Sequence, residues 1–375
     1  MTSRRRFIFH GSVVLVGSLV AELRAQGSRY PLPAEPAAFA GAIDRGRTLV
    51  AGIVTSRQIP GFSVAVAVDG RVAWSEGFGV ADAEQHVTVT PMTRFRLGSV
   101  SKVLTAAAVA RLVETGRLDL DAPIQQYVPG FPKKPWPITT RQLTSHTAGI
   151  RHYAGDFQGV LSSAPHFASV TKGLTIFQDD PLLFEPGTSY SYSSYGWNLV
   201  SAVVEGASRT EFLTYMQREI FEPLNLRNTA ADHVDAIIPH RTGFYRRRED
   251  GTLVHAPYQD NSYKWAGGGF LSTAEDLVRF GSAHLQPGFF TERTLDMLFA
   301  DQRLRSGKNT GVGIAWRISA DSKGRRIVHH GGSIDGGRAM LMVFPESKVV
   351  VAMLANLLAD FGEREAQQLG DLFIP

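Results

Sequence analysis

Short apolar runs that fit β-strands lie near both ends of the chain. Residues 62–68 and 71–79 are two such runs, and the intervening Asp69-Gly70 favours the tight turn of a β-hairpin. Four more strands are expected near the other end, at 313–319, 326–330, 339–344 and 348–355. The pattern therefore predicts strands at both ends of the chain.

Apolar residues at helical spacing occupy much of the remainder. Helices are expected at 36–56, 99–114 and 360–373, and the segment of about 120–300 has mainly helices broken by Pro and Gly loops. Within it, Ser272-Thr273-Ala274-Glu275 fits the capping box of a helix start. This order predicts an α+β fold, in which one antiparallel sheet of N- and C-terminal strands is flanked by helices and lies beside a mainly helical subdomain.

The first 25 residues have the pattern of an export signal. Three arginines at 4–6 precede an apolar run of roughly 11 residues, and the small residue Ala25 offers a cleavage point. The sequence Ser-Arg-Arg-x-Phe-Ile at 3–8 resembles the twin-arginine signal, which exports folded proteins. We therefore expect a periplasmic or extracellular protein without a stable membrane span; an uncleaved N-terminal anchor is the alternative. The expected organisation is a signal peptide at 1–25, a linker at 26–35 and one large domain at 36–375.

Composition and charge exclude several classes of protein. The chain has 375 residues, 43% of them hydrophobic, and no Cys, which excludes disulfides, Cys-based zinc sites, iron–sulfur clusters and thiol nucleophiles. The net charge is +4, and residues 1–25 contribute +3 of it. The remaining chain lacks the basic cluster of a nucleic-acid interface. No two of the 11 His have the spacing of metal ligands on a helix. We expect no metal, organic cofactor or nucleic-acid partner.

A candidate nucleophile is found in the pattern Ser-x-x-Lys, which is typical of serine enzymes that react with penicillins. It occurs twice, at Ser99 with Lys102 and at Ser169 with Lys172. Ser99 opens a strongly amphipathic helix, on which residues three apart share a face, so the Lys102 amine can reach the Ser99 hydroxyl. No helical apolar run follows Lys172. The context therefore favours Ser99 as the nucleophile.

A serine hydroxyl needs a base to become a nucleophile. Lys102 can serve if it is neutral part of the time, which desolvation and a nearby cation favour. A tyrosine phenolate stabilised by Lys102 is the other candidate. The Ser- and Tyr-rich run at 189–196 supplies three tyrosines, of which Tyr192 is the best aligned. The choice between the two bases stays open.

Five ordered motifs resemble those of the serine β-lactamase-like superfamily, which includes class C β-lactamases, D-alanyl-D-alanine carboxypeptidases and related esterases. The resemblance covers about residues 38–360 and implies the β-lactamase/transpeptidase-like fold. The matching segments are 95–102 (FRLGSVSK), 143–150 (LTSHTAGI), 186–194 (PGTSYSYSS), 266–273 (AGGGFLST) and 330–332 (HGG).

The resemblance implies a role for each matching residue. Ser99 would be acylated, Lys102 would assist proton transfer, and Tyr192 would act as general base or acid. The backbone N–H groups of Ser99 and Ser333 would form the oxyanion hole, where such donors are worth roughly 3–4 kcal/mol in the transition state. His146 lies in a matching segment but is expected to be structural.

Two departures concern the residues expected to bind substrate. Ser194 stands where the family often has Asn, and a hydroxyl cannot replace both the donor and the acceptor of an amide. This tract is closer to the mitochondrial serine β-lactamase-like members, in which a small hydroxyl residue also follows Tyr-Ser. His330-Gly331-Gly332 replaces Lys-Thr-Gly, so recognition of a substrate carboxylate is weakened unless His330 is protonated or Arg338 assists. Both departures argue against an efficient β-lactamase.

The expected function is an exported serine hydrolase that cleaves peptide, amide or ester bonds of a small-molecule or peptide substrate through a Ser99 acyl-enzyme. A D-peptidase or esterase is favoured. The alternatives are a β-lactamase acting on penicillins or cephalosporins, and a non-catalytic binding or assembly protein that keeps the fold. The sequence leaves the oligomeric state open.

Overall fold

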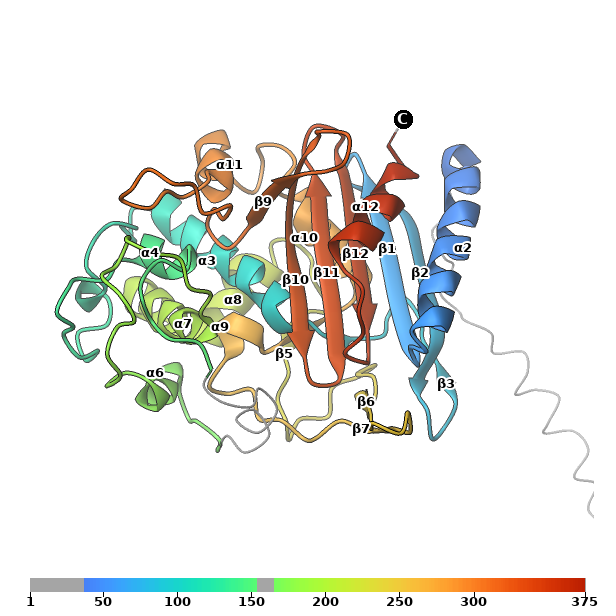
Figure 1. Cartoon of the computed structure of the whole chain (residues 1–375), viewed down its shortest axis with the longest axis horizontal. Helices are drawn as coiled ribbons and strands as arrows, with labels where there is room; N and C mark the ends of the chain where they lie inside the picture. Colours follow the sequence, from blue (N-terminus) through green and yellow to red (C-terminus); the bar gives the residue numbers. More distant parts are fainter. Residues whose placement is uncertain (1–36, 154–164, 375) are drawn as a thin grey trace, which may run out of the picture.

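The computed structural model describes residues 37–153 and 165–374. Its main element is a seven-stranded antiparallel sheet with the strand order β3-β2-β1-β12-β11-β10-β9 (Figure 1). The strands are β1 (Gly61–Val68), β2 (Arg71–Asp82), β3 (Val87–Thr88), β9 (Arg317–Ala320), β10 (Arg326–Ile334), β11 (Gly337–Phe344) and β12 (Val349–Ala355). The expected signal peptide, its cleavage point and the linker lie outside the described residues.

The two ends of the domain meet in the middle of this sheet. β1 pairs with β12 from Phe62 opposite Ala355 to Val68 opposite Val349, and Figure 1 shows the blue β1 beside the red β12. β1 and β2 form the expected hairpin around Asp69-Gly70. The predicted α+β fold, with an antiparallel sheet made by both ends of the chain, is confirmed.

One face of the sheet is covered by helices α2 (Ala40–Ser56) and α12 (Glu363–Asp371). Ile43 and Leu369 of these helices pack with Phe62 and Met342 of the strands in one buried apolar cluster. Burial of such side chains contributes roughly 1.5–3 kcal/mol each. The N- and C-terminal helices therefore stabilise the same face, as Figure 1 shows.

The opposite face is covered by α10 (Ala274–Ser282), which packs against β1 and β12. Behind α10 lies the helical part of the molecule, around the almost wholly buried α3 (Ser101–Glu114). The segment 120–300 holds most of these helices, together with α10 of the sheet layer and four short strands. Within the described ranges, no helix is both long and apolar enough to cross a membrane.

The remaining elements are short. The other α-helices are α4 (Thr140–Thr144), α6 (Val170–Gly173), α7 (Ser194–Ser208), α8 (Phe212–Met216), α9 (Trp265–Gly268) and α11 (Glu292–Phe299). Single turns of other helix types are η1 (Ala37–Phe39), η2 (Gly98–Val100), η3 (Ile124–Gln126), η4 (Leu174–Ile176) and η5 (Gln217–Phe221). The short strands β4 (Phe95–Arg96), β8 (Phe270–Ser272) and β5 (Ala230–Ala231) form one small sheet, and β6 (Tyr245–Arg247) pairs with β7 (Leu253–His255).

Candidate active site

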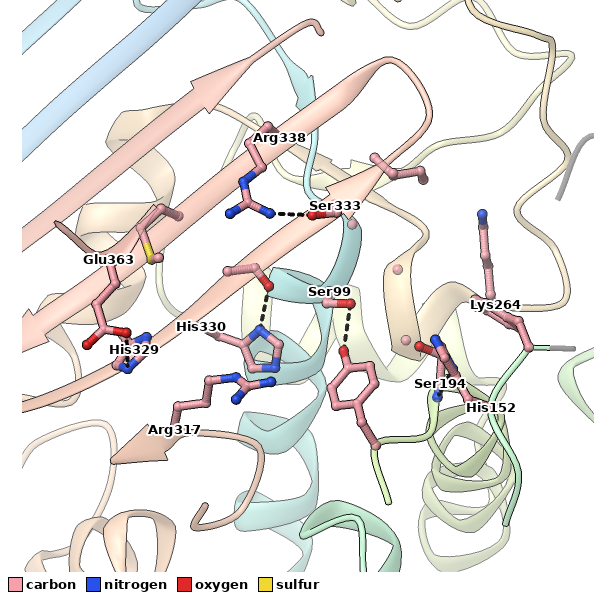
Figure 2. A pocket seen from close by; sticks show the side chains of 18 residues that line it. Ser99, His152, Ser194, Lys264, Arg317, His329, His330, Ser333, Arg338 and Glu363 are labelled. Carbon is pink, nitrogen blue, oxygen red and sulfur yellow. Dashed lines mark hydrogen bonds and ion pairs between the residues drawn. The ribbon is translucent and has the colours of Figure 1, made fainter. Parts of the chain in front are cut away.

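Ser99 lies at the bend between β4 and α3, within the one-turn helix η2. The preceding Gly98 has φ = +49°, and a Cβ there would lie 2.9 Å from the backbone N of Ser333. Glycine satisfies both conditions because it has no Cβ. Strand β10 therefore approaches the start of α3 closely, and Ser99 borders a cavity of about 450 Å³ beside that strand (Figure 2).

Lys102 is fully buried one turn after Ser99. Its Nζ donates hydrogen bonds to Ser99 Oγ at 3.0 Å, Ser194 Oγ at 3.1 Å and the Gly267 carbonyl at 2.7 Å. Three acceptors match the three N–H donors of an ammonium. Burial lowers the pKa of Lys102 below its ordinary value, although interaction with Tyr192 opposes this effect.

Tyr192 lies on the other side of the nucleophile. Its Oη is 2.8 Å from Ser99 Oγ, and Lys102 Nζ lies 5.1 Å from the centre of its ring. Burial alone raises the pKa of Tyr192, but the charge of Lys102 and the hydrogen bonds to Lys102 and Ser99 together outweigh it, so the pKa is lowered overall. The structure therefore brings Ser99, Lys102 and Tyr192, the three predicted catalytic residues, into direct contact.

Two histidines support the segment that carries Tyr192: His146 is buried and His152 is half-buried. The backbone N–H of Ser193 donates to Nδ1 of His146, and the N–H of Ser194 donates to Nδ1 of His152, each at 3.1 Å. Burial holds the pKa of His146 well below its ordinary value and lowers that of His152 to about 4. Both rings are neutral at pH 7 and their Nδ1 atoms are engaged, which suits the structural role expected of His146.

The end of strand β10 forms one wall of the cavity. A Cβ added to Gly332 would lie 1.9 Å from the carbonyl oxygen of Leu97 and 3.1 Å from the backbone N of Ser99, so only glycine allows this approach. His330 is buried, and its Nδ1–H donates to the Gly331 carbonyl at 2.7 Å. Burial and nearby charges hold the pKa of His330 well below its usual range. The imidazole is therefore neutral and supplies no charge for a substrate carboxylate.

The other expected binding residues also border the cavity. Ser194 Oγ accepts the hydrogen bond from Lys102 at 3.1 Å. Arg338 donates to the Phe361 carbonyl at 2.8 Å and to Ser333 Oγ. Figure 2 shows its guanidinium turned toward Ser333. Arg338 thus holds the strand residue beside the expected oxyanion hole.

Sequence reasoning missed two cations that line the cavity, Arg317 and Lys264. The Arg317 guanidinium lies 5.8 Å from the centre of the Tyr192 ring, and Figure 2 places it beside His330. Lys264 is 3% exposed and precedes the glycine-rich motif by two residues. Neither residue belongs to a short sequence motif that would mark it as functional. For Lys264, the one indication in the sequence was its position two residues before a matching motif.

The second Ser-x-x-Lys pattern has a structural role. Ser169 caps α6, because its Oγ accepts a hydrogen bond from the backbone N of Lys172 at 3.3 Å. The Lys172 side chain is exposed. In the described part of the chain, no group of three or more His, Asp or Glu is placed to hold a metal ion.

Comparison with known proteins identifies the class. The profile of the Beta-lactamase family matches residues 47–372. The chain therefore belongs to this family of β-lactamase-fold serine hydrolases, which confirms the resemblance drawn from the five motifs. Among individual relatives, it is 33% identical to the human serine beta-lactamase-like protein LACTB, mitochondrial, over 84% of this chain and 74% of that protein.

Solved structures confirm the fold. A D-stereospecific amidohydrolase from Streptomyces sp. matches with a TM-score of 0.73 at 22% identity, over 88% of this chain and 98% of that chain. EstCE1, a hydrolase with promiscuous acyltransferase activity, matches with a TM-score of 0.73 at 21% identity, over 91% of this chain and all of that chain.

Proposed function

We propose that this chain is an exported serine hydrolase that cleaves peptide, amide or ester bonds through an acyl-enzyme on Ser99. One observation carries the proposal: Ser99 Oγ lies within hydrogen-bond distance of both Lys102 Nζ and Tyr192 Oη. A buried ammonium is costly to desolvate, and a merely structural position could hold an apolar residue instead. This arrangement suits acyl transfer better than a binding role.

In the proposed step, Lys102 remains an ammonium and Tyr192 is the base. The Tyr192 phenolate takes the proton of Ser99 as Oγ bonds to the carbonyl carbon, and the carbonyl electron pair moves onto its oxygen. The N–H groups of Ser99 and Ser333 stabilise that oxyanion. Its collapse breaks the bond to the leaving nitrogen or oxygen, which receives the proton from Tyr192. Water then attacks the acyl-enzyme through the same groups in reverse.

The substrate class favoured is a D-peptide, amide or simple ester rather than a β-lactam. Ser194 supplies one polar atom where an Asn amide supplies two, and neutral His330 supplies no cation. Arg317, beside Tyr192, is the fixed positive charge on the side of the leaving group. The activities named for the amidohydrolase and EstCE1 fit this preference.

The decisive experiment is intact-mass analysis after incubation with a fluorescent penicillin, beside hydrolysis of nitrophenyl esters and D-amino-acid peptides. We expect a single adduct on Ser99 and turnover of an ester or D-peptide faster than of penicillin. No adduct and no turnover of any substrate would contradict the proposal and support a binding protein. Faster turnover of penicillin would identify a β-lactamase.

Export is proposed on the N-terminal pattern alone. Replacing Arg4 and Arg5 by Lys in a bacterial host should retain the protein in the cytoplasm, because the twin-arginine pair is the feature that the export pathway reads. Cell fractionation and N-terminal sequencing of the exported protein measure this. An exported protein that still begins at Met1 would indicate an uncleaved anchor.

A further inference from the structure

The cavity beside Ser99 contains a buried lysine that the proposed mechanism does not use. Lys264 borders this cavity, and its side chain is 3% exposed. The hydrogen bond found for its Nζ goes to Gln259 Oε1, at a long 3.4 Å. An ammonium has three N–H donors, so Lys264 has donor capacity left for a molecule in the cavity.

The carboxylates near Lys264 do not neutralise it by direct pairing. Asp232 is engaged by Arg96 at 2.8 Å, by Arg241 at 3.2 Å and by the Asn261 amide at 2.9 Å. No carboxylate within the described ranges lies at ion-pair distance from Lys264 Nζ. Since a buried cation is unfavourable without a close anion, the site favours an anionic ligand group.

The position of Lys264 indicates which part of the substrate it would meet. Tyr192 returns its proton to the leaving group, and Arg317 lies beside Tyr192, so that end of the cavity holds the leaving group. Arg317 is close enough to interact electrostatically with His330, near the middle of β10. Lys264 interacts in the same way with Asp335, just past the end of that strand. Figure 2 shows Arg317 and Lys264 on opposite sides of Ser99. Lys264 therefore lies toward the acyl part of the substrate.

We propose that Lys264 recognises a carboxylate on the acyl part of the substrate, so that the enzyme prefers acyl groups derived from dicarboxylic acids. This inference rests on the proposed function, because it requires a Ser99 acyl-enzyme. It adds an anionic group to the substrate, on the side of the cleaved bond away from Arg317.

The test compares 4-nitrophenyl monoesters of glutaric, adipic and pimelic acid with the 4-nitrophenyl esters of pentanoic, hexanoic and heptanoic acid. Each pair has equal chain length and differs in the terminal carboxylate, and enzyme-free hydrolysis is subtracted. For at least one length, we expect kcat/KM to be about tenfold or more higher for the dicarboxylic ester, as expected of a hydrogen bond between charged groups.

The variant Lys264→Met should reduce this ratio to about one. A loss of folded enzyme lowers both rates equally and leaves the ratio unchanged, so the ratio reports on recognition. The exposed Lys172→Met is the matched control and should keep the ratio of the wild type. The inference is overturned if the wild type hydrolyses the esters without preferring the dicarboxylic monoester at any chain length, or if that preference persists in Lys264→Met. If the wild type hydrolyses none of the esters, the proposed function itself is overturned.

A pH series on the unmodified protein provides a second measurement. Burial lowers the pKa of Lys264 to about 7, in the presence of Arg96, Asp232, Lys102 and Asp335 from the elements packed around it. The ammonium is lost as the pH rises through this pKa, so the preference should be larger at pH 6 than at pH 9. Effects on the catalytic groups cancel in the ratio. A ratio that stays constant across this range would contradict recognition by Lys264.

Discussion

At the scale of single residues, the hydroxyl of Ser99 is the point on which the other groups converge. Ser99→Ala removes the atom that would bond to the acyl group while leaving Lys102 its two other acceptors. We expect acylation and ester turnover to fall at least about 1000-fold, as for other serine nucleophiles, without loss of the fold. Intact-mass labelling and steady-state kinetics measure this.

The matched control is the serine of the second Ser-x-x-Lys pattern. Ser169→Ala removes a helix cap and costs about 1 kcal/mol of stability, but should leave the activity intact. Activity retained in Ser99→Ala, or lost in Ser169→Ala, would mean that the wrong serine has been assigned.

Tyr192 permits a test of which group is the base. Burial raises the pKa of Tyr192, but the charge of Lys102 and the hydrogen bonds to Lys102 and Ser99 together lower it overall, so the phenolate forms at a lower pH than in a free phenol. The acylation rate should therefore rise with pH and level off below pH 10. Tyr192→Phe should reduce the rate about 100- to 10,000-fold and abolish this rise.

The pH–rate profile of Tyr192→Phe separates the two candidate bases. If neutral Lys102 is the base, the variant keeps a rise with pH. That rise would be displaced to lower pH, since Tyr192 no longer raises the pKa of Lys102. A retained rise would therefore assign the base to Lys102.

The sequence supported the assignment of Ser99 and Lys102 because their proximity is local: three residues apart near a helix start, they share a face. Tyr192 was reached through the motif order, since nothing local places it opposite Ser99. Arg317 and Lys264 were missed because their positions depend on how distant segments pack around the cavity.

At the scale of elements, the approach of β10 to the start of α3 determines the shape of the site. Gly332→Ala would place a Cβ 1.9 Å from the Leu97 carbonyl oxygen. The Cβ is bonded to the backbone and the oxygen is part of it, so neither atom can move aside without moving its chain segment. Separation of the two elements should cost about 1–3 kcal/mol or more and move Ser333 away from Ser99. We expect a lower thermal midpoint and a large loss of acylation.

The adjacent glycine serves as a control for stability. A Cβ added to Gly331 meets its nearest atom, the Cε of Met340, at an ordinary 3.6 Å. Gly331→Ala should therefore keep a thermal midpoint close to that of the wild type. Equal destabilisation of the two variants would show that the contact with Leu97 is not the cause.

Element boundaries were predicted less well than the elements. The strand expected at 326–330 continues to Ile334, because pairing with β11 carries it through the two glycines that usually weaken a strand. The strand expected at 313–319 begins at Arg317. The cap of α10 is Thr273, which accepts a hydrogen bond from the backbone N of Asp276, and not the expected Ser272. Neighbouring residues with similar capping ability cannot be ranked without the backbone.

At the scale of the whole molecule, the sheet joins the first and last parts of the domain. This topology was predictable, because strands at both ends with helices between them have few other ways to bury their apolar faces. The sequence did not predict which helices cover which face of the sheet. For example, α10 lies within a mainly helical stretch of sequence yet packs on the sheet. That choice depends on tertiary contacts between segments distant in sequence.

This closure predicts that the C-terminal helix is necessary for the fold of the whole domain. A chain ending at Asp360 lacks Phe361, Leu369 and Phe373, which are buried against the sheet. It also lacks Glu365, whose ion pair with Arg57 at 2.7 Å joins α12 to the end of α2. The three apolar side chains alone contribute roughly 5–9 kcal/mol, a large share of the roughly 5–15 kcal/mol typical of a folded protein.

We therefore expect the shortened chain to show no cooperative thermal unfolding and to form no Ser99 adduct. It also lacks Glu363 of α12, which borders the same cavity as Ser99. The full-length variant Gln368→Ala, which changes an exposed residue of the same helix, should unfold like the wild type. Circular dichroism and penicillin labelling measure both properties. A shortened chain that still unfolds cooperatively and is labelled would show that β12, held by β1 and β11, completes the sheet without its terminal helix.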